Sequence, residues 1–446
     1  MKANAYDKPP PFTWDKVQVR EPLPVYPPPG PLVYPELPSR PRKPAFEALF
    51  TLSTHIFPAC HLRTTRPVPV PTPPPANASK EERRRILAET RAQLDAYRTT
   101  KVTDGYPRLL WNCVNRYVKN DLNEKNRTGV TLFFAHANGF PKEIFEPTLR
   151  YLLSSPAANV IDEIWVWESV QHGDAGLLNA KSATGLFDWY DNARDISNFL
   201  LHFMPTLSSA SHLPTHLPRV EVEETKTRLQ TGFQERRLMA IGHSYGGCTS
   251  TLAATIYPQL FDALYLIDPV ILQPYNQPKP YVLRDLASGA LNRRETWSSR
   301  EEAYESFKRN PFFAAWDDEV LKIYVECGLY ETTDESGERV AKLKMPGVQE
   351  AVVFAEVHTE HEVFDRLSRL DDRIAIRWAM PGKPGAPELG RPGDTKTKVW
   401  VRPNNATNTR ILGGGHLIPQ EAPQELAEDL KEYVLERFTT PLRANL

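Results

Sequence analysis

The sequence lacks the segments that would carry it into a membrane or through secretion. No run of about 18 apolar residues occurs, so we expect no membrane-spanning helix. The chain begins MKANAYDKPPPF, without the apolar stretch that a secretory signal needs. Cysteine is also scarce. Its four copies (Cys60, Cys113, Cys248 and Cys327) are scattered and have no metal-type spacing, which predicts reduced thiols in an intracellular compartment rather than a disulfide framework.

An excess of charge of either sign is missing as well. Lys and Arg number 54 and Asp and Glu 55, for a net charge of −1. We find no basic stripe interleaved with aromatic residues, so nucleic acid is not expected as a partner. With 446 residues, of which 41% are hydrophobic, the chain can form a large core with additions.

Proline is abundant and unevenly spread. Of the 42 prolines, 20 fall in residues 1–75, where they remove backbone donors and disfavour helices and central strands. We therefore expect this segment to be extended, as a wrapping arm or, alternatively, as an SH3-type ligand at residues 27–31. The following aromatic residues would anchor the arm: Trp14, Tyr26, Tyr34, Phe46 and Phe50. One helix is predicted after it, at residues 79–98, since Ser79 and Glu82 form a capping box.

From about residue 106, short apolar runs alternate with helical stretches. The alternation predicts a mostly parallel central sheet flanked by helices on both faces. The predicted strands are residues 109–118, 130–137, 163–170, 237–244, 263–270, 373–380 and 407–412, and the clearest helices are 141–154, 188–203 and 245–257.

Two insertions interrupt this alternation. Residues 206–232 are polar and contain two prolines, which is typical of a surface loop. Residues 271–364 contain two helical patterns and predict a mostly helical cap over the carboxyl edge of the sheet. The predicted organisation is a proline-rich extension with one helix (1–105), a first core segment (106–270), the cap (271–364) and a second core segment (365–446).

The strongest chemical signal is the pentapeptide Gly242-His243-Ser244-Tyr245-Gly246. It matches G-x-S-x-G, in which a serine lies on a tight strand-to-helix turn that needs small neighbours. An apolar run precedes it and a helix-forming run follows it, as that turn requires. We expect Ser244 to be a nucleophile; a helix cap at an ordinary turn is the alternative.

A serine hydroxyl is a weak nucleophile and needs a base. His416 follows the last predicted strand in Gly413-Gly414-Gly415-His416 and precedes a C-terminal helix. The chain order serine, acid, histidine places the base on this loop. His358 and His361 are spaced like metal ligands, but two histidines without a third ligand do not predict a site.

The third member of such a triad is a carboxylate that orients the histidine. The segment after residues 373–380, PGKPGAPELGRPGD, offers only the distant Glu388 and Asp394. Asp268 lies at the end of the strand beside that of Ser244, and we favour it while keeping the other two open. Its alternative role is structural, as a helix cap or an ion-pair partner.

Acyl transfer also needs donors for the oxyanion. The backbone N–H of Tyr245 is expected to be one. The other is expected at Asn138, with Ala137 as the alternative, in the loop after residues 130–137. We expect structural roles for His136, His172 and Asp174.

Six motifs in order resemble a known family. The motifs are AHANGFPKE, ESVQHGDAG, DWYDNARD, IGHSYGG, LIDPV and GGGHLIPQEAP, and the resemblance covers roughly residues 106–440. The set resembles fungal α/β-hydrolases, among them the yeast peroxisomal lipase and the peroxisomal hydrolases of host-selective toxin biosynthesis. The resemblance implies an α/β-hydrolase fold and a Ser-His-Asp hydrolase of esters or acyl groups. It carries over directly to Ser244 and His416.

The function expected from these residues is a serine esterase or lipase that needs no metal or organic cofactor. A thioesterase or acyltransferase acting on CoA-linked intermediates is the first alternative, with Arg293, Arg294 and Lys308 as a candidate basic rim. A catalytically silent scaffold that acts through the proline-rich arm is the second. The expected partner is a small acyl ester or thioester.

The C-terminal tripeptide Ala444-Asn445-Leu446 resembles the small–polar–Leu peroxisomal signal. It predicts a peroxisomal import receptor as a further partner and a peroxisomal location, with a cytoplasmic one as the alternative.

Overall fold

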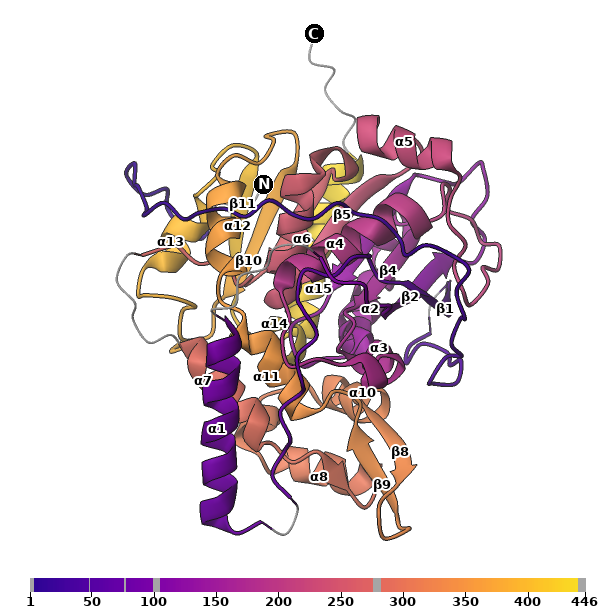
Figure 1. The fold of residues 1–446 in the computed structure, drawn as a ribbon. Helices are drawn as coiled ribbons and strands as arrows, with labels where there is room; N and C mark the ends of the chain where they lie inside the picture. The colour runs from indigo at the N-terminus through magenta and orange to yellow at the C-terminus, as the bar shows by residue number, and fades with distance from the viewer. Residues whose placement is uncertain (1–3, 48, 76–77, 99–104, 276–281, 440–446) are drawn as a thin grey trace.

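The computed structural model describes residues 4–47, 49–75, 78–98, 105–275 and 282–439. An eight-stranded sheet crosses the molecule in the order β1-β2-β4-β3-β5-β6-β10-β11 (Figure 1). The pairs β1–β2 and β2–β4 are antiparallel and all other neighbours are parallel. The strands are β1 (Phe50–Pro58), β2 (Trp111–Lys119), β3 (Val130–Ala135), β4 (Glu163–Glu168), β5 (Arg237–His243), β6 (Ala263–Ile267), β10 (Ala375–Pro381) and β11 (Ala406–Ile411).

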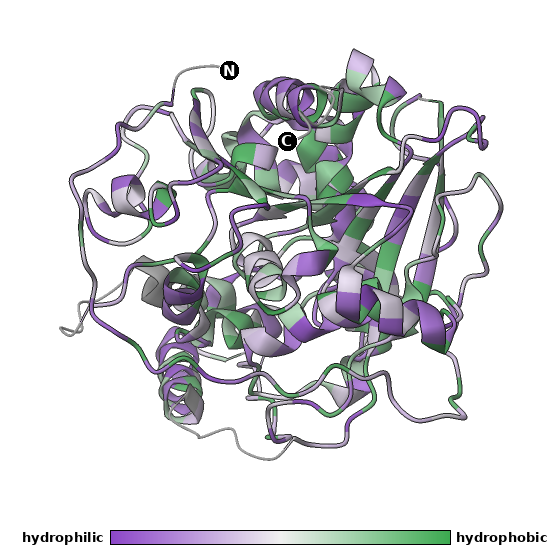
Figure 2. Cartoon of the chain, turned by 90° about the horizontal axis from the view of Figure 1, so that it is seen from above, coloured by the Kyte–Doolittle hydropathy of each residue, from purple (hydrophilic) through white to green (hydrophobic). Residues whose placement is uncertain are grey.

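Helices cover both faces of this sheet. The helices of the core are α2 (Glu146–Leu153), α3 (Gly173–Leu178), α4 (Trp189–Asn198), α5 (Val222–Thr231), α6 (Tyr245–Ile256), α12 (Thr359–Leu367), α13 (Asp394–Val399), α14 (Ile418–Glu421) and α15 (Pro423–Thr439). Alternate residues of β3 enter two different cores, since Phe133 packs with α4 and α6 while Leu132 and Phe134 pack with α2 and α15. Figure 2 shows hydrophobic segments on the strands and on the helices against them. The strands predicted beyond residue 106 are confirmed.

The cap lies at one end of the molecule, at the bottom of Figure 1. Its helices are α7 (Val282–Asn292), α8 (Arg300–Lys308), α9 (Pro311–Ala314), α10 (Asp318–Gly328) and α11 (Gly347–Ala355). It also holds a three-stranded sheet, β7-β9-β8, made of β7 (Thr296–Trp297), β8 (Leu329–Thr333) and β9 (Arg339–Leu343). The cap is therefore less purely helical than its two helical patterns predicted, because β8 and β9 are short strands with little period-2 signal.

The proline-rich segment is largely a wrapping arm, as expected. Trp14 packs edge-on against Phe364 with ring centroids 5.3 Å apart, and Tyr34 lies 5.3 Å from the ring of Trp111. Tyr26 is 63% exposed, so its ring is not the anchor that the sequence predicted, although its carbonyl accepts from the His61 N–H at 2.8 Å. The predicted helix is α1 (Lys80–Arg98), whose Glu82 N–H donates to Ser79 Oγ at 3.1 Å.

Two segments differ from expectation. Residues 50–58, placed in the extension, are the edge strand β1 of the main sheet, which forms because β2 offers it a full antiparallel register. Residues 206–232, expected to be a surface loop, include α5, whose Arg228 donates to the carbonyls of Leu200 and Met204 at 2.8 Å.

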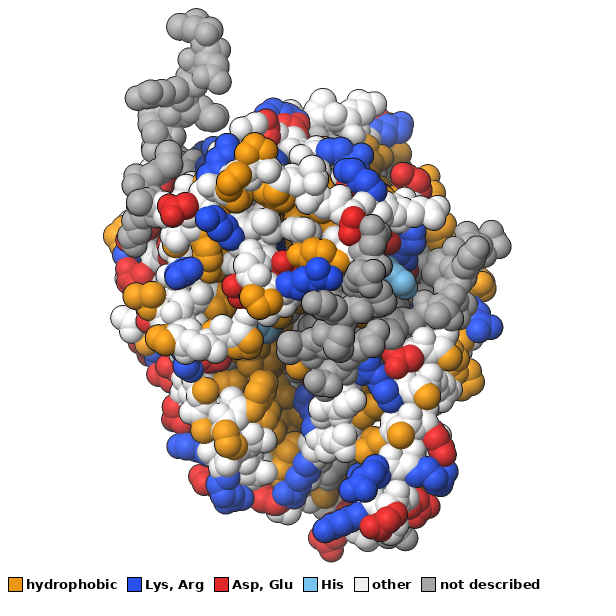
Figure 3. Space-filling model, turned by 90° about the vertical axis from the view of Figure 1, so that its left-hand side faces the viewer, with side chains coloured by type: hydrophobic (Ala, Val, Ile, Leu, Met, Phe, Trp, Pro, Cys, Tyr) orange, Lys and Arg blue, Asp and Glu red, His pale blue; other side chains and the backbone are white. Residues whose placement is uncertain are grey.

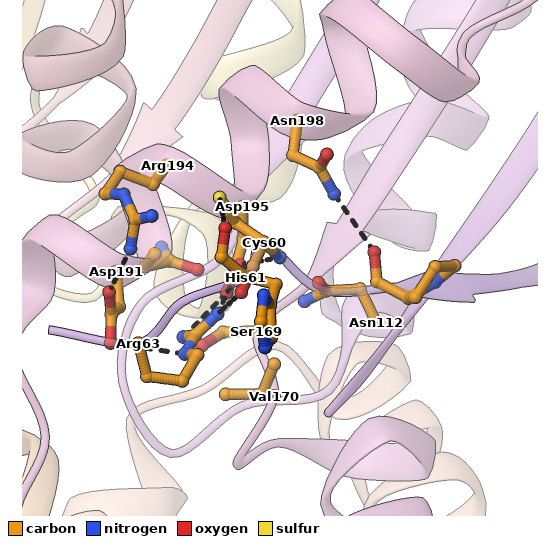
Figure 4. Close-up of polar contacts among 12 residues, drawn as sticks. Cys60, His61, Arg63, Asn112, Ser169, Val170, Asp191, Arg194, Asp195 and Asn198 are labelled. Atoms are coloured by element: carbon orange, nitrogen blue, oxygen red, sulfur yellow. Dashed lines mark hydrogen bonds and ion pairs between the residues drawn. The ribbon is translucent and has the colours of Figure 1, made fainter. Parts of the chain in front are cut away.

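A buried ionic network ties the chain around β1 to helix α4 (Figure 4). Arg63 donates to both carboxylate oxygens of Asp195, at 2.6 and 3.0 Å, and the Asp195 carboxylate also accepts from the Cys60 N–H. Asp191 accepts from the Thr64 N–H and from Arg194. The charged residues of the DWYDNARD motif in this network therefore hold the arm in place, and all four cysteines are buried and free.

Candidate functional site

Ser244 lies between the end of β5 and the start of α6. Its backbone has φ 54° and ψ −115°, a region that non-glycine residues seldom occupy. The glycines around it are required by close backbone approaches. A Cβ on Gly246 would lie 2.4 Å from the carbonyl oxygen of Ala135, and one on Gly242 would lie 2.5 Å from the Cα of Gly247. The tight turn predicted for the pentapeptide is confirmed.

His416 lies beside Ser244 on the loop after β11. Its Nε2 is 3.0 Å from Ser244 Oγ, and its Nδ1 is 2.7 Å from Asp268 Oδ2. A carboxylate only accepts hydrogen bonds, so Asp268 assigns the imidazole proton to Nδ1 and leaves the Nε2 lone pair facing the serine hydroxyl. Three residues from distant parts of the sequence thus form one hydrogen-bonded chain.

Asp268 closes that chain from the end of β6. Its own φ is 32°, and its N–H donates to the carbonyl of Ala379 in β10 at 3.0 Å. Burial alone would raise the pKa of Asp268, but Lys398 and the hydrogen bond from His416 outweigh burial, so this pKa lies below its ordinary value. The carboxylate is therefore kept charged although the residue is only 2% exposed.

The other two candidate acids are engaged elsewhere. Glu388 accepts from the N–H groups of Gly393 and Thr395, at 3.2 and 2.9 Å, where α13 begins. Asp394 accepts from the N–H of Arg391 at 2.7 Å and from the Tyr275 hydroxyl. Neither carboxylate contacts His416, so Asp268 is the one of the three that the fold brings to the histidine.

Asn138 follows β3 on the other side of Ser244. Its side chain is held at both ends, because Nδ2 donates to the carbonyl of Glu350 and Oδ1 accepts from His172 Nε2, each at 3.0 Å. The backbone N–H of Asn138 is thus the group that remains for a donor role. Tyr245 supplies the first N–H of α6, which has no intrahelical acceptor.

Two buried histidines, His136 and His243, order the loops around these groups. His136 donates from Nδ1 to the carbonyl of Ala137 at 2.8 Å and accepts from the Ser169 N–H, the loop-ordering role expected for it. His243 donates from Nε2 to the backbone carbonyl of His416 at 2.8 Å. Burial lowers the pKa of His136 to about 4 and, with His416 adding to it, that of His243 to about 3. Both rings are therefore neutral near pH 7.

A buried charge cluster lies behind the Asn138 loop. Lys142 Nζ contacts Glu168 at 3.2 Å and Asp174 at 3.0 Å. Asp174 also accepts from Lys344 of the cap and Ser39 of the arm, both at 2.6 Å. The cluster joins arm, cap and core at one carboxylate. Its members are far apart in the sequence, and only the structural role expected of Asp174 pointed to it.

The pair His358 and His361, at the start of α12, does not form a metal site with its described neighbours. His361 Nδ1 contacts the carbonyl of Leu272 at 3.0 Å, and the His361 N–H donates to the carbonyl of His358. Among the described residues no cluster of three His, Cys, Asp or Glu side chains suits a metal ion.

Comparisons with known proteins agree with this architecture. A model of the alpha/beta hydrolase family matches residues 132–429. The type I acyl-CoA thioesterase of Penicillium brevicompactum is 29% identical over 178 residues, which are 39% of this chain and 34% of that protein. The chain thus spans about a third of the length of this relative.

A second relative is similar over a longer stretch. The peroxisomal membrane protein Lpx1 of Saccharomyces cerevisiae is 23% identical over 348 residues, covering 74% of this chain and 82% of that protein. Its solved structure superposes with a TM-score of 0.59 at 19% identity, over 89% of this chain and 92% of the other. The fold, the order of motifs and the matched span together show that this chain belongs to the alpha/beta hydrolase family.

Proposed function

We propose that this protein is a serine hydrolase that cleaves carboxylic esters through an acyl-enzyme, with Ser244 as nucleophile, His416 as base and Asp268 as the acid that orients the base. One observation carries the proposal: the hydrogen-bonded chain from Ser244 Oγ through His416 to Asp268, with contacts of 3.0 and 2.7 Å. Nucleophile and base lie within proton-transfer reach, and the base is oriented by a third group.

The proposed reaction has two steps. His416 Nε2 takes the Ser244 proton as Oγ attacks the ester carbonyl, and the resulting imidazolium is stabilised by Asp268. The N–H groups of Tyr245 and Asn138 receive the oxyanion. His416 then protonates the departing alcohol, and in the second step it activates a water that hydrolyses the acyl-enzyme.

The cap is proposed to select the acyl group. It touches the oxyanion side of the site through the carbonyl of Glu350, which holds the Asn138 side chain. Since α11 carries Glu350, a substrate that displaces the cap also moves the loop that supplies one oxyanion donor.

Thioester hydrolysis is the second candidate, because the Penicillium relative is an acyl-CoA thioesterase. The basic rim expected for a CoA phosphate is weaker than the sequence suggested. Arg293 pairs with Glu350, Arg294 with Glu302, and Lys308 with Asp318, so each of these cations already has a carboxylate partner. Figure 3 likewise shows positive and negative side chains interspersed on the face it displays. Simple esters are therefore the preferred substrate class.

A peroxisomal location is proposed alongside this function. Lpx1 is named as a peroxisomal protein. The tripeptide Ala444-Asn445-Leu446 lies outside the described residues. A search of the described helices finds none with the length and apolar character to cross a bilayer.

Fluorophosphonate labelling tests the proposed function. We expect the wild type to be labelled at Ser244, mapped by mass spectrometry, and the Ser244→Ala protein to remain unlabelled. Ser250 provides a matched control, because it is a buried serine in α6, the helix that follows Ser244, and Ser250→Ala should label normally. A folded wild type that resists labelling would overturn the proposal and favour the scaffold alternative. A panel of esters and acyl-CoAs then separates the two substrate classes.

A further inference from the structure

A lysine lies on the far side of the Asp268 carboxylate. Lys398 projects from α13, and its side chain is 2% exposed. Its Nζ is 3.4 Å from Asp268 Oδ1 and 3.2 Å from the carbonyl oxygen of Pro269. The two oxygens of Asp268 are thus divided between Lys398 and His416. The segment after β10, where the sequence led us to look for an acid, contributes this buried cation instead.

We infer that Lys398 is a positioning residue, which holds Asp268 Oδ1 so that Oδ2 faces His416 and whose charge offsets part of the negative charge that Asp268 presents to His416. The inference rests on the proposed function, since it assigns a role around the same serine site. Asp268 has a positive φ, and Lys398 grips both its carboxylate and the next carbonyl along the chain. The lysine therefore restrains the turn as well as the side chain.

The effect of the Lys398 charge follows from the arrangement of three groups, in which Asp268 lies between Lys398 and His416. An anion beside an imidazole favours its protonated form, and a cation nearby opposes it. Lys398 compensates part of the negative charge that His416 would otherwise experience from Asp268.

Among the described residues, Lys398 is the lysine or arginine in contact with Asp268, and the other charged groups nearby are engaged elsewhere. His243, from β5, is neutral near pH 7. Glu421, from α14, accepts the Gly415 N–H and pairs with Lys383 at 2.8 Å. Arg410 lies over the ring of Tyr6 of the arm, with its Cζ 4.3 Å from the ring centroid.

Glu388 completes the set, because it faces Lys398 from the loop before α13 and is itself held by two backbone N–H groups. It remains in place in every variant described below. A change at position 398 therefore acts on His416 through Asp268.

The test measures the rate constant of fluorophosphonate labelling between pH 5 and 9, which needs no known substrate. The acid limb of this profile is the part where the labelling rate falls as the pH is lowered. In Lys398→Met and Lys398→Gln it should move up by about one pH unit, so that labelling at pH values below it slows about tenfold. Lys398→Arg keeps the charge and should keep the wild-type limb. Lys396→Met, an exposed lysine of the same helix, is the matched control and should change nothing.

Two neutral variants are used in case one does not fold. If Lys398→Met fails to fold, Lys398→Gln still offers Asp268 a hydrogen-bond donor. An unchanged acid limb in a folded neutral variant would overturn the role of Lys398 while leaving the hydrolase proposal intact. A limb that moved equally in Lys398→Arg would overturn the charge effect. Absence of labelling in the wild type would instead refute the proposed function.

Discussion

Asp268→Asn is the most informative substitution, because the structure predicts which way the new amide will face. The Lys398 ammonium donates to Asp268 Oδ1 and cannot accept a hydrogen bond. In the variant it will therefore donate to the carbonyl oxygen of the asparagine side chain. The NH2 group must then face His416 Nδ1. Since that group donates, it forces the imidazole to keep its proton on Nε2, the nitrogen that faces Ser244 at 3.0 Å in the wild type.

The expected cost is large because the wrong tautomer cannot accept the serine proton. Removal of the acid from a serine triad with the geometry otherwise intact lowers the rate on the order of 10⁴-fold, about 5.5 kcal/mol of transition-state stabilisation. The buried lysine also loses its anionic partner. We therefore expect a lower free energy of unfolding, by about 3 kcal/mol for a broken buried ion pair.

The assay is the labelling rate of wild type, Asp268→Asn and the double variant Asp268→Asn/Lys398→Met. Without Lys398 the amide can turn its oxygen toward His416 Nδ1 and restore the productive tautomer. The double variant should therefore label about tenfold faster than Asp268→Asn alone. A single variant that kept a tenth of the wild-type rate, or a double variant slower than the single, would refute this reasoning.

Three further predictions rest on other contacts of the fold. Arg63→Met leaves Asp191 and Asp195 buried without their common cation and should lower the free energy of unfolding by about 3–5 kcal/mol in urea titration, whereas the exposed Arg66→Met should leave it unchanged. Gly246→Ala places a methyl group against two backbone carbonyls and should abolish labelling and lower the melting temperature; Gly289→Ala, which meets nothing within 4 Å, should do neither. His55, His136 and His243 have folded pKa values lowered by burial to about 4, 4 and 3, so protons bind the unfolded chain first as the pH falls below about 6.5. The free energy of unfolding should consequently fall by up to about 1.4 kcal/mol per histidine for each unit between pH 6.5 and 4, and urea midpoints that stayed constant over this range would contradict the burial of these rings.

Much of the core was readable from local pattern. The apolar runs of β3, β4, β5 and β6 are short, uninterrupted and bounded by helices, which is the signature of buried parallel strands. The tight turn at Ser244 was equally local, because its strained φ depends on glycines within three residues of it. Sequence alone also predicted the helix at Lys80–Arg98 from its capping box.

The remaining features depend on contacts between residues far apart in the chain. Asp268, Glu388 and Asp394 are all carboxylates after strands, and only the folded positions of β6, β10 and the His416 loop distinguish them. Nothing in the polar stretch around Lys398 marks this lysine as part of the site, and only the packing of α13 against Asp268 brings the two side chains together. Edge strand β1 forms because β2 supplies its hydrogen-bond partners, a tertiary contact that no local propensity encodes. The sequence by itself thus determined the strands of the main sheet from β2 onward, the helix α1 and the serine turn, whose causes lie within a few residues. Only the tertiary structure decided which charges meet, because burial and Coulomb interactions depend on distance in space rather than along the chain.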